Sequence, residues 1–158
     1  MEPIFTDAYF MQRALQEAAA AFEKGEVPVG AVVVAQDRII ARAHNLTEQL
    51  SDVTAHAEMQ AITAATQHIG GKYLQGCTLY VTLEPCLMCA GALYWSQISR
   101  VVYGASDPKR GGLSMFSNNE EFPKEGQSPP LHPKTQLVGG VMATEATQLL
   151  QDFFAKKR

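Results

Sequence analysis

The chain contains little cysteine and no long apolar run, and both shortages narrow the class of protein. Three cysteines in 158 residues are too few, and odd in number, for a disulfide framework. No stretch approaches the ~18 consecutive apolar residues that a membrane-spanning helix needs. The start, Met1-Glu2-Pro3, lacks the basic and apolar regions of a signal peptide. We therefore expect a cytoplasmic protein with reduced thiols and no membrane partner.

The sequence also lacks a large excess of charge of either sign. Its 13 Lys and Arg against 16 Asp and Glu give a net charge of −3, which argues against a surface dominated by phosphate-binding groups. Basic residues are nevertheless concentrated in residues 100–158, which permits a local nucleic-acid surface without requiring one. Length and an ordinary apolar content of 46% predict one compact domain over residues 1–158.

The order of expected elements predicts an α/β domain. Asp7 is placed to cap a first helix that ends at Lys24-Gly25, and Thr54 to cap a second that ends at Gly70-Gly71. Two more helices are expected, one after Pro85 and one at the C-terminus. Strands are expected at residues 29–35, 38–43, 77–82, 100–104 and 136–139, and a long loop at 105–135. This order predicts a sheet with helices packed on both faces, in three layers.

Two short motifs carry the chemistry. The first, Thr54-Ala55-His56-Ala57-Glu58, is weak by itself, because residues two apart on a helix point in different directions. The second, Glu84-Pro85-Cys86-Leu87-Met88-Cys89, is stronger, because it places two thiols at the start of an expected helix, where thiolates are favoured. Alone, the cysteine pair indicates either a redox pair or half of a zinc site.

Together the motifs favour a catalytic zinc site. His56, Cys86 and Cys89 supply three ligands and leave the fourth tetrahedral position open, as catalytic zinc requires. Such a zinc lowers the pKa of bound water toward ~7, and Glu58 can take the proton. The same combination, His-x-Glu with Pro-Cys-x-x-Cys, is the recognised signature of zinc nucleobase deaminases.

A structural zinc site would need a fourth protein ligand. Cys77 and His44 are the candidates, but Cys77 lies in an apolar strand and His44 ends the expected hairpin. We assign no role to either of them, nor to His68 or His132.

Several segments resemble the cytidine-deaminase-like superfamily, and in particular the bacterial tRNA-specific adenosine deaminases, which convert the wobble adenosine of an anticodon to inosine. The resemblance implies a three-layer α/β/α cytidine-deaminase-like fold with a central mixed sheet of about five strands. It covers most of the chain. The matching segments are EVPVGAV at 26–32, TAHAE at 54–58, LYVTLEPCLMCAG at 79–91 and RVVYGASD at 100–107, with Lys109 and Gly111.

The resemblance also implies roles for single residues. His56, Cys86 and Cys89 would hold one Zn²⁺ per subunit, and zinc-bound hydroxide would attack C6 of adenine with Glu58 as catalytic proton shuttle. Asn45, Val29 and Asp107 would bind the substrate. The expected partners are a tRNA anticodon loop and a second copy of the chain, which helps to form the RNA site. Further RNA contacts would come from Lys109, Arg110, Phe153, Phe154, Lys156, Lys157 and Arg158. Without the family, a helix packed by its aromatics and ending in solvated cations is the preferred explanation of this tail.

Some segments depart from the tRNA deaminase pattern and leave alternatives open. Leu46-Thr47-Glu48 and the proline-rich 105–135 segment differ at the expected pocket rim, and Leu93-Tyr94-Trp95 is similar to bacterial guanine deaminases. A free guanine or cytosine deaminase is therefore the alternative within the fold. Packing at a helix end or dimer interface explains Tyr94 and Trp95 as well. An alternative of another class is a non-catalytic, zinc-stabilised RNA-binding module.

Overall fold

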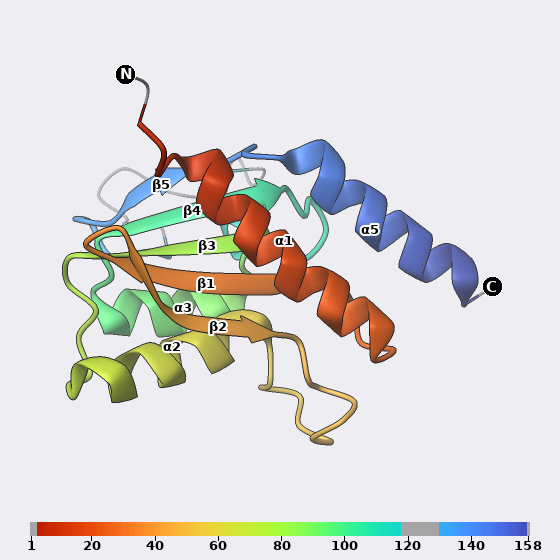
Figure 1. Ribbon diagram of the computed structural model, residues 1–158, viewed down its shortest axis with the longest axis horizontal. Helices are drawn as coiled ribbons and strands as arrows, with labels where there is room; N and C mark the ends of the chain where they lie inside the picture. Colours follow the sequence, from red (N-terminus) through yellow and green to blue (C-terminus); the bar gives the residue numbers. More distant parts are fainter. Residues whose placement is uncertain (1–2, 118–129, 158) are drawn as a thin grey trace.

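A mixed five-stranded sheet in the order β2-β1-β3-β4-β5 forms the centre of the computed structural model, which describes residues 3–117 and 130–157 (Figure 1). β1 runs antiparallel to both β2 and β3, whereas β3, β4 and β5 run parallel to one another. The strands are β1 (Gly30–Ala35), β2 (Arg38–His44), β3 (Cys77–Leu83), β4 (Arg100–Ala105) and β5 (Gln136–Val138).

Helices cover both faces of the sheet, so the predicted three-layer architecture is confirmed. The helices α1 (Asp7–Glu23) and α5 (Ala143–Lys156) lie on one face, and α2 (Ala57–Ile69) and α3 (Leu87–Ser96) on the other (Figure 1). The segment predicted as a long loop contains a further short helix, α4 (Gly112–Ser117). None of the helices in the described part of the chain combines the length and apolar character that a bilayer crossing requires.

Small residues bring the layers together. The face of α2 that packs on the sheet is built from Ala57, Ala61 and Ala65, all fully buried. At the start of β1, a side chain on Gly30 would overlap the backbone carbonyl of Ala14, so α1 can cross the strand closely only because this residue is glycine. Both faces of β1 are thus buried, which agrees with its nearly continuous apolar sequence.

The strand directions gather four chain segments at one edge of the sheet. Parallel β3 and β4 end there, and the chain continues into Glu84 and Ser106. Because β1 is antiparallel to β3, its beginning near Val29 lies at the same edge, and so does the end of β2 before Asn45. This edge is where polar side chains from distant parts of the sequence can meet.

Two of the predicted helix caps are wrong. Thr6 rather than Asp7 caps α1, because the Thr6 hydroxyl accepts the Tyr9 backbone N–H at 3.1 Å. At α2 the N-cap is His56 rather than Thr54. The Thr54 backbone N–H and hydroxyl donate to the Asp52 carboxylate at 2.8 and 2.7 Å. The Thr54 side chain is therefore engaged in a local Asx turn before the helix begins and does not cap α2.

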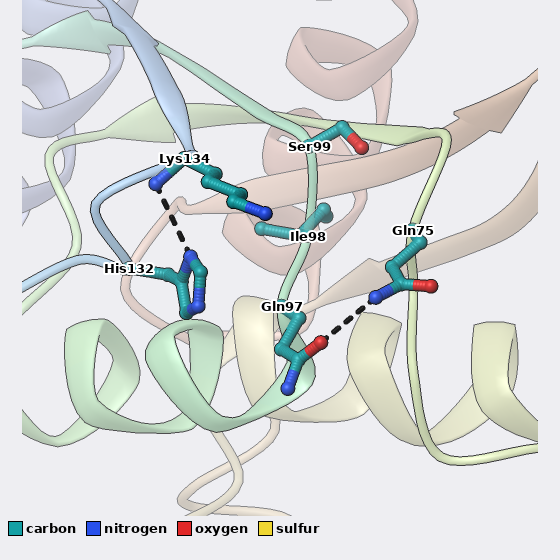
Figure 2. A pocket seen from close by; sticks show the side chains of 6 residues that line it. All are labelled: Gln75, Gln97, Ile98, Ser99, His132 and Lys134. Atoms are coloured by element: carbon teal, nitrogen blue, oxygen red, sulfur yellow. Dashed lines mark hydrogen bonds between the residues drawn. The ribbon is translucent and has the colours of Figure 1, made fainter.

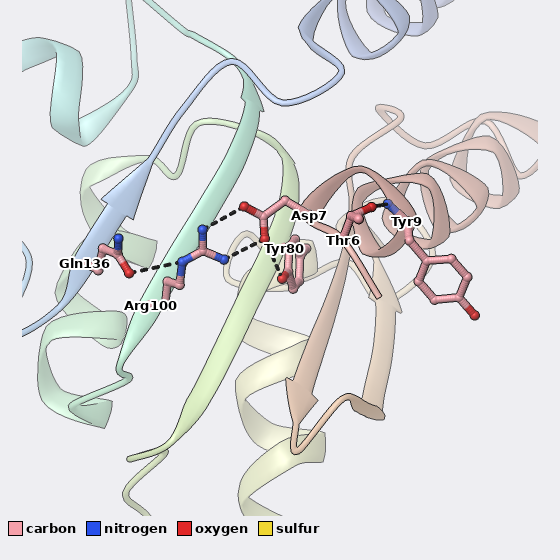
Figure 3. Close-up of polar contacts among 6 residues, drawn as sticks. All are labelled: Thr6, Asp7, Tyr9, Tyr80, Arg100 and Gln136. Atoms are coloured by element: carbon pink, nitrogen blue, oxygen red, sulfur yellow. Dashed lines mark hydrogen bonds and ion pairs between the residues drawn. The ribbon is translucent and has the colours of Figure 1, made fainter. Parts of the chain in front are cut away.

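Asp7 instead ties the start of α1 to the sheet (Figure 3). Its carboxylate accepts two hydrogen bonds from Arg100 at 2.6 and 2.7 Å and one from the Tyr80 hydroxyl at 2.8 Å. The Arg100 guanidinium also reaches Gln136 at 3.2 Å, so one network joins α1 to three strands. The hydrogen bonds from Arg100 hold the pKa of Asp7 below its usual value of 3.8.

We predict that Asp7→Asn lowers the free energy of unfolding at pH 7 by about 1–2 kcal/mol, because charge-assisted hydrogen bonds are lost. Since the folded-state pKa of Asp7 is lowered, its contribution is complete above the unfolded pKa of ~3.9 and is lost as the pH falls through the lower folded value. Urea unfolding of both proteins should therefore show a difference that shrinks below about pH 4. A difference that is independent of pH contradicts this account.

Candidate active site

A pocket of about 610 Å³ opens at the sheet edge where the four segments meet. Its walls come from the residues around Val29, from the Asn45 loop, from the starts of α2 and α3, and from the segment after β4, with α5 closing one side. Nine of the sequence-predicted site residues line it: Val29, Asn45, His56, Glu58, Cys86, Asp107, Lys109, Arg110 and Phe154.

Three potential metal ligands converge at the base of this pocket. The His56 Nδ1 atom lies 3.6 Å from the sulfur of Cys86 and 3.6 Å from that of Cys89. Usual Zn–S and Zn–N bond lengths in a tetrahedral site place sulfur and nitrogen ligands about 3.6 Å apart, so the three side chains fit a zinc ion. Among the described residues, no other His, Cys, Asp or Glu joins this cluster.

The ligands owe their convergence to two helix starts. His56 is the N-cap of α2 and Cys86 the N-cap of α3, and both have extended backbones with no side-chain capping bond. Each side chain is therefore free to turn away from its helix. Two residues that are two positions apart within a helix point in different directions. His56 precedes α2 instead of lying within it, so its side chain and that of Glu58 can face the same site. The two helix N-termini also favour negative charge at this point.

The two thiols are not electrostatically equivalent. Hydrogen bonding from Cys89, with a further contribution from His56, lowers the pKa of Cys86 to about 4. The same hydrogen bond, together with burial, raises the pKa of Cys89. The hydrogen bond with Cys86 in turn raises the pKa of His56. Zinc requires both sulfurs as thiolates and the imidazole as a neutral ligand, so metal binding displaces the protons that these groups carry.

Glu58 is the buried carboxylate of the pocket. Only 4% of the residue is exposed, and burial raises its pKa to about 7. It lies in the first turn of α2, beside the ligand cluster without belonging to it. A carboxyl group that is half protonated near neutral pH is suited to accept and return a proton during a reaction.

The residues expected to bind substrate are held by local hydrogen bonds. The Asn45 backbone N–H donates to the Val29 carbonyl at 3.1 Å, and the Asn45 side-chain oxygen accepts the Thr47 N–H at 3.3 Å. One carboxylate oxygen of Asp107 accepts the backbone N–H groups of Lys109 and Arg110 at 3.3 and 3.1 Å. Part of Asp107 therefore shapes its own turn, which places both cations at the pocket rim.

The C-terminal helix presents only one of its two phenylalanines to the pocket. Phe154 is 49% exposed and lines the wall, whereas Phe153 is buried and packs edge-on against Phe22 at 5.8 Å. Phe153 was expected to contact RNA; in the structure its ring is part of the α1–α5 contact. Lys156 and Lys157 are exposed and lie over the Phe22 and Phe153 rings. Arg158 lies outside the described residues.

The other histidines and cysteines of uncertain role lie away from the cluster. His44 pairs with Glu17 at 2.8 Å through Nδ1 and contacts the Lys24 ammonium at 3.0 Å through Nε2. Cys77 is buried in β3, and burial raises the pKa of its thiol. Neither supplies the fourth ligand that a structural zinc site would need.

Tyr94 and Trp95 do not line the pocket. Their rings meet edge-to-face at 5.4 Å, and Trp95 is 77% exposed on α3. Within one copy of the chain, these aromatics are therefore surface residues rather than part of the substrate wall.

Sequence reasoning missed two buried carboxylates beside the pocket. Glu26 is fully buried and accepts the backbone N–H groups of Glu48 and Gln49 at 2.9 and 3.0 Å. Glu84 is 3% exposed and accepts hydrogen bonds from the segment after β4. The sequence signal for both residues was an acidic side chain inside an otherwise apolar or motif-rich stretch. This signal does not reveal their hydrogen-bond partners, which lie 22 to 30 residues away in the sequence.

A second hollow, of about 310 Å³, has a different character (Figure 2). It lies just before β4 and β5, at the sheet edge opposite the metal cluster, and a Gln75–Gln97 hydrogen bond of 2.8 Å crosses it. It contains no thiol or carboxylate, and His132 is the one potential metal ligand among the described residues that line it. Its lining residues are Gln75, Gln97, Ile98, Ser99, His132 and Lys134.

Comparison with known families indicates what kind of site the larger pocket is. Residues 5–105 match the family described as cytidine and deoxycytidylate deaminase zinc-binding region. The chain belongs to this family. The family match and the His56, Cys86 and Cys89 cluster confirm the expected cofactor, one zinc ion per subunit. The protein is a zinc-binding deaminase.

Similar proteins share nearly the whole length of the chain. It is 48% identical over 151 residues to a tRNA-specific adenosine deaminase of Aquifex aeolicus, with 95% of both chains covered. The corresponding protein of Bacillus subtilis is 45% identical over 155 residues, covering 96% of this chain and 91% of that one. These similarities agree with the family resemblance of the motifs.

Solved structures confirm the predicted cytidine-deaminase-like fold. One from a study of A-to-I editing by tRNA:A34 deaminases matches with a TM-score of 0.78 at 42% identity, covering 90% of this chain and 99% of that one. The guanine deaminase of Nitrosomonas europaea reaches the same TM-score of 0.78 at 23% identity, with 95% and 85% covered, and shares the fold.

We predict that the purified protein holds one zinc ion per chain in a shell of two sulfur atoms, one nitrogen and one light atom from solvent. Metal analysis should find that Cys86→Ser loses most of the zinc, whereas the matched variant Cys77→Ser keeps it. X-ray absorption at the zinc edge reports the shell. A third sulfur or a second histidine nitrogen contradicts the three-ligand site.

Proposed function

We propose that this protein deaminates adenosine to inosine at the wobble position of a tRNA anticodon. The observation that supports this most directly is the composition of one pocket. It combines a three-ligand metal cluster, a buried carboxyl group with a pKa near 7, and a rim that carries cations and an exposed aromatic ring. The first two features suit hydrolytic deamination, and the rim suits a nucleic-acid substrate.

In this proposal His56, Cys86 and Cys89 hold the zinc ion. Zinc, when bound there, lowers the pKa of a water molecule and so supplies the nucleophile at neutral pH. Glu58 is the catalytic proton carrier: it receives one proton from water and delivers it to the adenine ring nitrogen beside C6, and it then takes the second proton from the new hydroxyl group on C6 and delivers it to the departing amine. Ammonia and inosine are the products. The raised pKa of Glu58 suits both transfers.

Val29 and Asn45 form the wall against which the base would pack. Both are more than nine-tenths buried, so they offer an apolar surface and an amide at a fixed position. The target base must leave its stack to reach the metal, and an unpaired anticodon loop lowers that cost. Asp107 also lines the pocket, where it can meet the sugar of the extruded nucleotide.

The rim would hold the RNA around the target nucleotide. Lys109 and Arg110 line the opening and are placed to meet phosphates, and Lys156 and Lys157 extend the basic surface along α5. Phe154 offers an exposed ring on which a neighbouring base can stack. Phe153 is not part of this proposal.

A free-base deaminase is the competing function. A guanine deaminase of Bacillus subtilis matches at 31% identity with a TM-score of 0.61, covering 94% of this chain and 91% of that one. The sequence similarity at Leu93-Tyr94-Trp95 pointed the same way. However, Tyr94 and Trp95 lie outside the pocket, and a free base needs no basic rim. The RNA substrate is therefore favoured.

We predict that the zinc-loaded protein converts the wobble adenosine of an arginine-tRNA anticodon stem-loop to inosine stoichiometrically, as measured by nucleoside mass spectrometry. Glu58→Ala should keep its zinc and lose about 10²- to 10⁴-fold in rate, because the proton carrier is removed. The exposed carboxylate of Glu23 provides the matched control, and Glu23→Ala should retain wild-type activity. Turnover of free guanine or cytosine with inert RNA would contradict the tRNA assignment.

We also propose that two copies of the chain associate through α3. Leu87, Met88 and Trp95 are 51, 37 and 77% exposed on this short helix. Met88 and Trp95 are two helical turns apart and therefore share a face. Large apolar side chains exposed together on one helix are typical of a protein–protein interface.

We predict that the wild-type protein sediments as a dimer at micromolar concentration and that Trp95→Glu shifts it to a monomer, because a charge would be buried in the interface. Leu137→Glu is the matched control: Leu137 is also an exposed apolar residue, but it lies on β5, away from α3, and should leave the dimer intact. A wild-type monomer, or a dimer that tolerates Trp95→Glu, contradicts this arrangement.

A further inference from the structure

Glu84 holds both ends of the chain segment that forms one side of the pocket. Its carboxylate accepts the Asp107 backbone N–H at 3.1 Å on Oε1 and the Ser114 backbone N–H at 2.7 Å on Oε2. The Ser114 hydroxyl donates to Oε1 as well. We call residues 107–114 the rim segment. One buried side chain at the end of β3 thus binds the beginning and the end of this segment.

The rim segment has no room to move toward β3. A side chain on Gly111 would overlap the Glu84 carboxylate, and Gly111 forms a backbone bridge with Cys86. The next residue, Gly112, donates its N–H to the Pro85 carbonyl at 2.9 Å. The segment is therefore packed around the turn that carries the metal ligand, and the Glu84 carboxylate lies at the centre of that packing.

The rim segment carries the charged residues of the opening. Asp107, Lys109 and Arg110 all line the pocket. The Asp107 carboxylate binds the backbone N–H groups of Lys109 and Arg110, and the Asp107 carbonyl accepts the Gly111 N–H at 2.8 Å. Fixing the backbone of Asp107 therefore fixes the turn from which both cations extend.

The chemistry of the contact requires a carboxylate. The three groups that contact Glu84 among the described residues are hydrogen-bond donors, and an acceptor on both oxygens satisfies them. A glutamine of the same size would turn an NH₂ group toward one of these donors and leave a buried N–H unsatisfied. The contact is thus sensitive to a change that preserves shape.

We propose that Glu84 is a positioning residue for RNA binding, which fixes the rim segment so that Lys109 and Arg110 meet the phosphates beside the target nucleotide. This inference rests on the proposed function. It assigns Glu84 to substrate affinity rather than to the chemical step, because its contacts run to the rim and it does not belong to the metal cluster.

The test compares kcat and KM on the anticodon stem-loop over a series of salt concentrations. For zinc-loaded Glu84→Gln we expect KM to rise by about 10-fold or more with kcat within about threefold of wild type, as for an interaction that serves binding. The dependence of kcat/KM on salt should also weaken, because fewer phosphates are neutralised. A variant that merely folds less well would lose apparent kcat and keep the wild-type salt dependence.

Two further variants make the comparison specific. Lys109→Ala/Arg110→Ala should weaken the salt dependence by itself, and adding Glu84→Gln to it should raise KM no further, since both changes act through the same contacts. Glu26→Gln is the matched control, because Glu26 is an equally buried carboxylate that accepts two backbone N–H groups from the other wall. Its salt dependence should match wild type. Unchanged salt dependence in Glu84→Gln, or additive effects, would overturn the proposal.

Hydrogen exchange tests the same contact without any activity. At least one of the two amides, of Asp107 or of Ser114, should exchange at least about 10-fold faster in Glu84→Gln than in wild type, because one of the two acceptor oxygens is replaced by NH₂. Ser114→Ala, a milder change, should raise KM in the same direction if Glu84→Gln loses its zinc. If the wild type makes no inosine, the proposed function fails, whereas unchanged exchange at these two amides overturns the role of Glu84 itself.

Discussion

His56 lies 3.6 Å from both cysteine sulfurs, and this contact between the starts of two helices is the constraint on which the remaining structure depends. His56 precedes α2 and Cys86 precedes α3, so their distance fixes how the two helices lie on the sheet. Small residues in α2 allow the close approach. Zinc binding would add to the free energy of folding because the ligands are brought together only in the folded chain. The same geometry places Glu58 next to the metal cluster and away from solvent.

Three buried carboxylates do two different tasks around one pocket. Glu58 has a pKa raised by burial, which suits proton transfer. Glu26 and Glu84 each accept backbone N–H groups from a loop on one side of the opening. Loops that carry binding residues usually tolerate motion, and such acceptors limit it by satisfying buried donors that regular secondary structure leaves unpaired. Reactivity and rigidity at this site therefore come from the same residue type in different surroundings.

The sequence predicts the layers and the succession of helices and strands along the chain well, because those follow from apolar patterning and turn residues. It also predicts the grouping of His56, Cys86 and Cys89, since residue type and spacing restrict zinc sites strongly. Prediction from sequence fails where a neighbouring side chain competes for a hydrogen bond. It also fails where the position of a side chain depends on packing against residues that are distant in the sequence. Asp52 accepts hydrogen bonds from Thr54 before the helix begins, and Phe153 packs against Phe22 whereas the adjacent Phe154 lines the pocket. The partners of Glu84 lie 23 and 30 residues away, which no local pattern records.

The central claim is that this pocket uses water to replace the amino group of an adenine held in RNA. The most direct test is deamination of the wobble-adenosine stem-loop in water enriched in ¹⁸O, with the released nucleosides analysed by mass spectrometry. The account predicts inosine that carries one ¹⁸O atom at C6, formed in a single turnover from zinc-loaded protein. Inosine without the label, or no inosine from protein with its zinc in place, would contradict it.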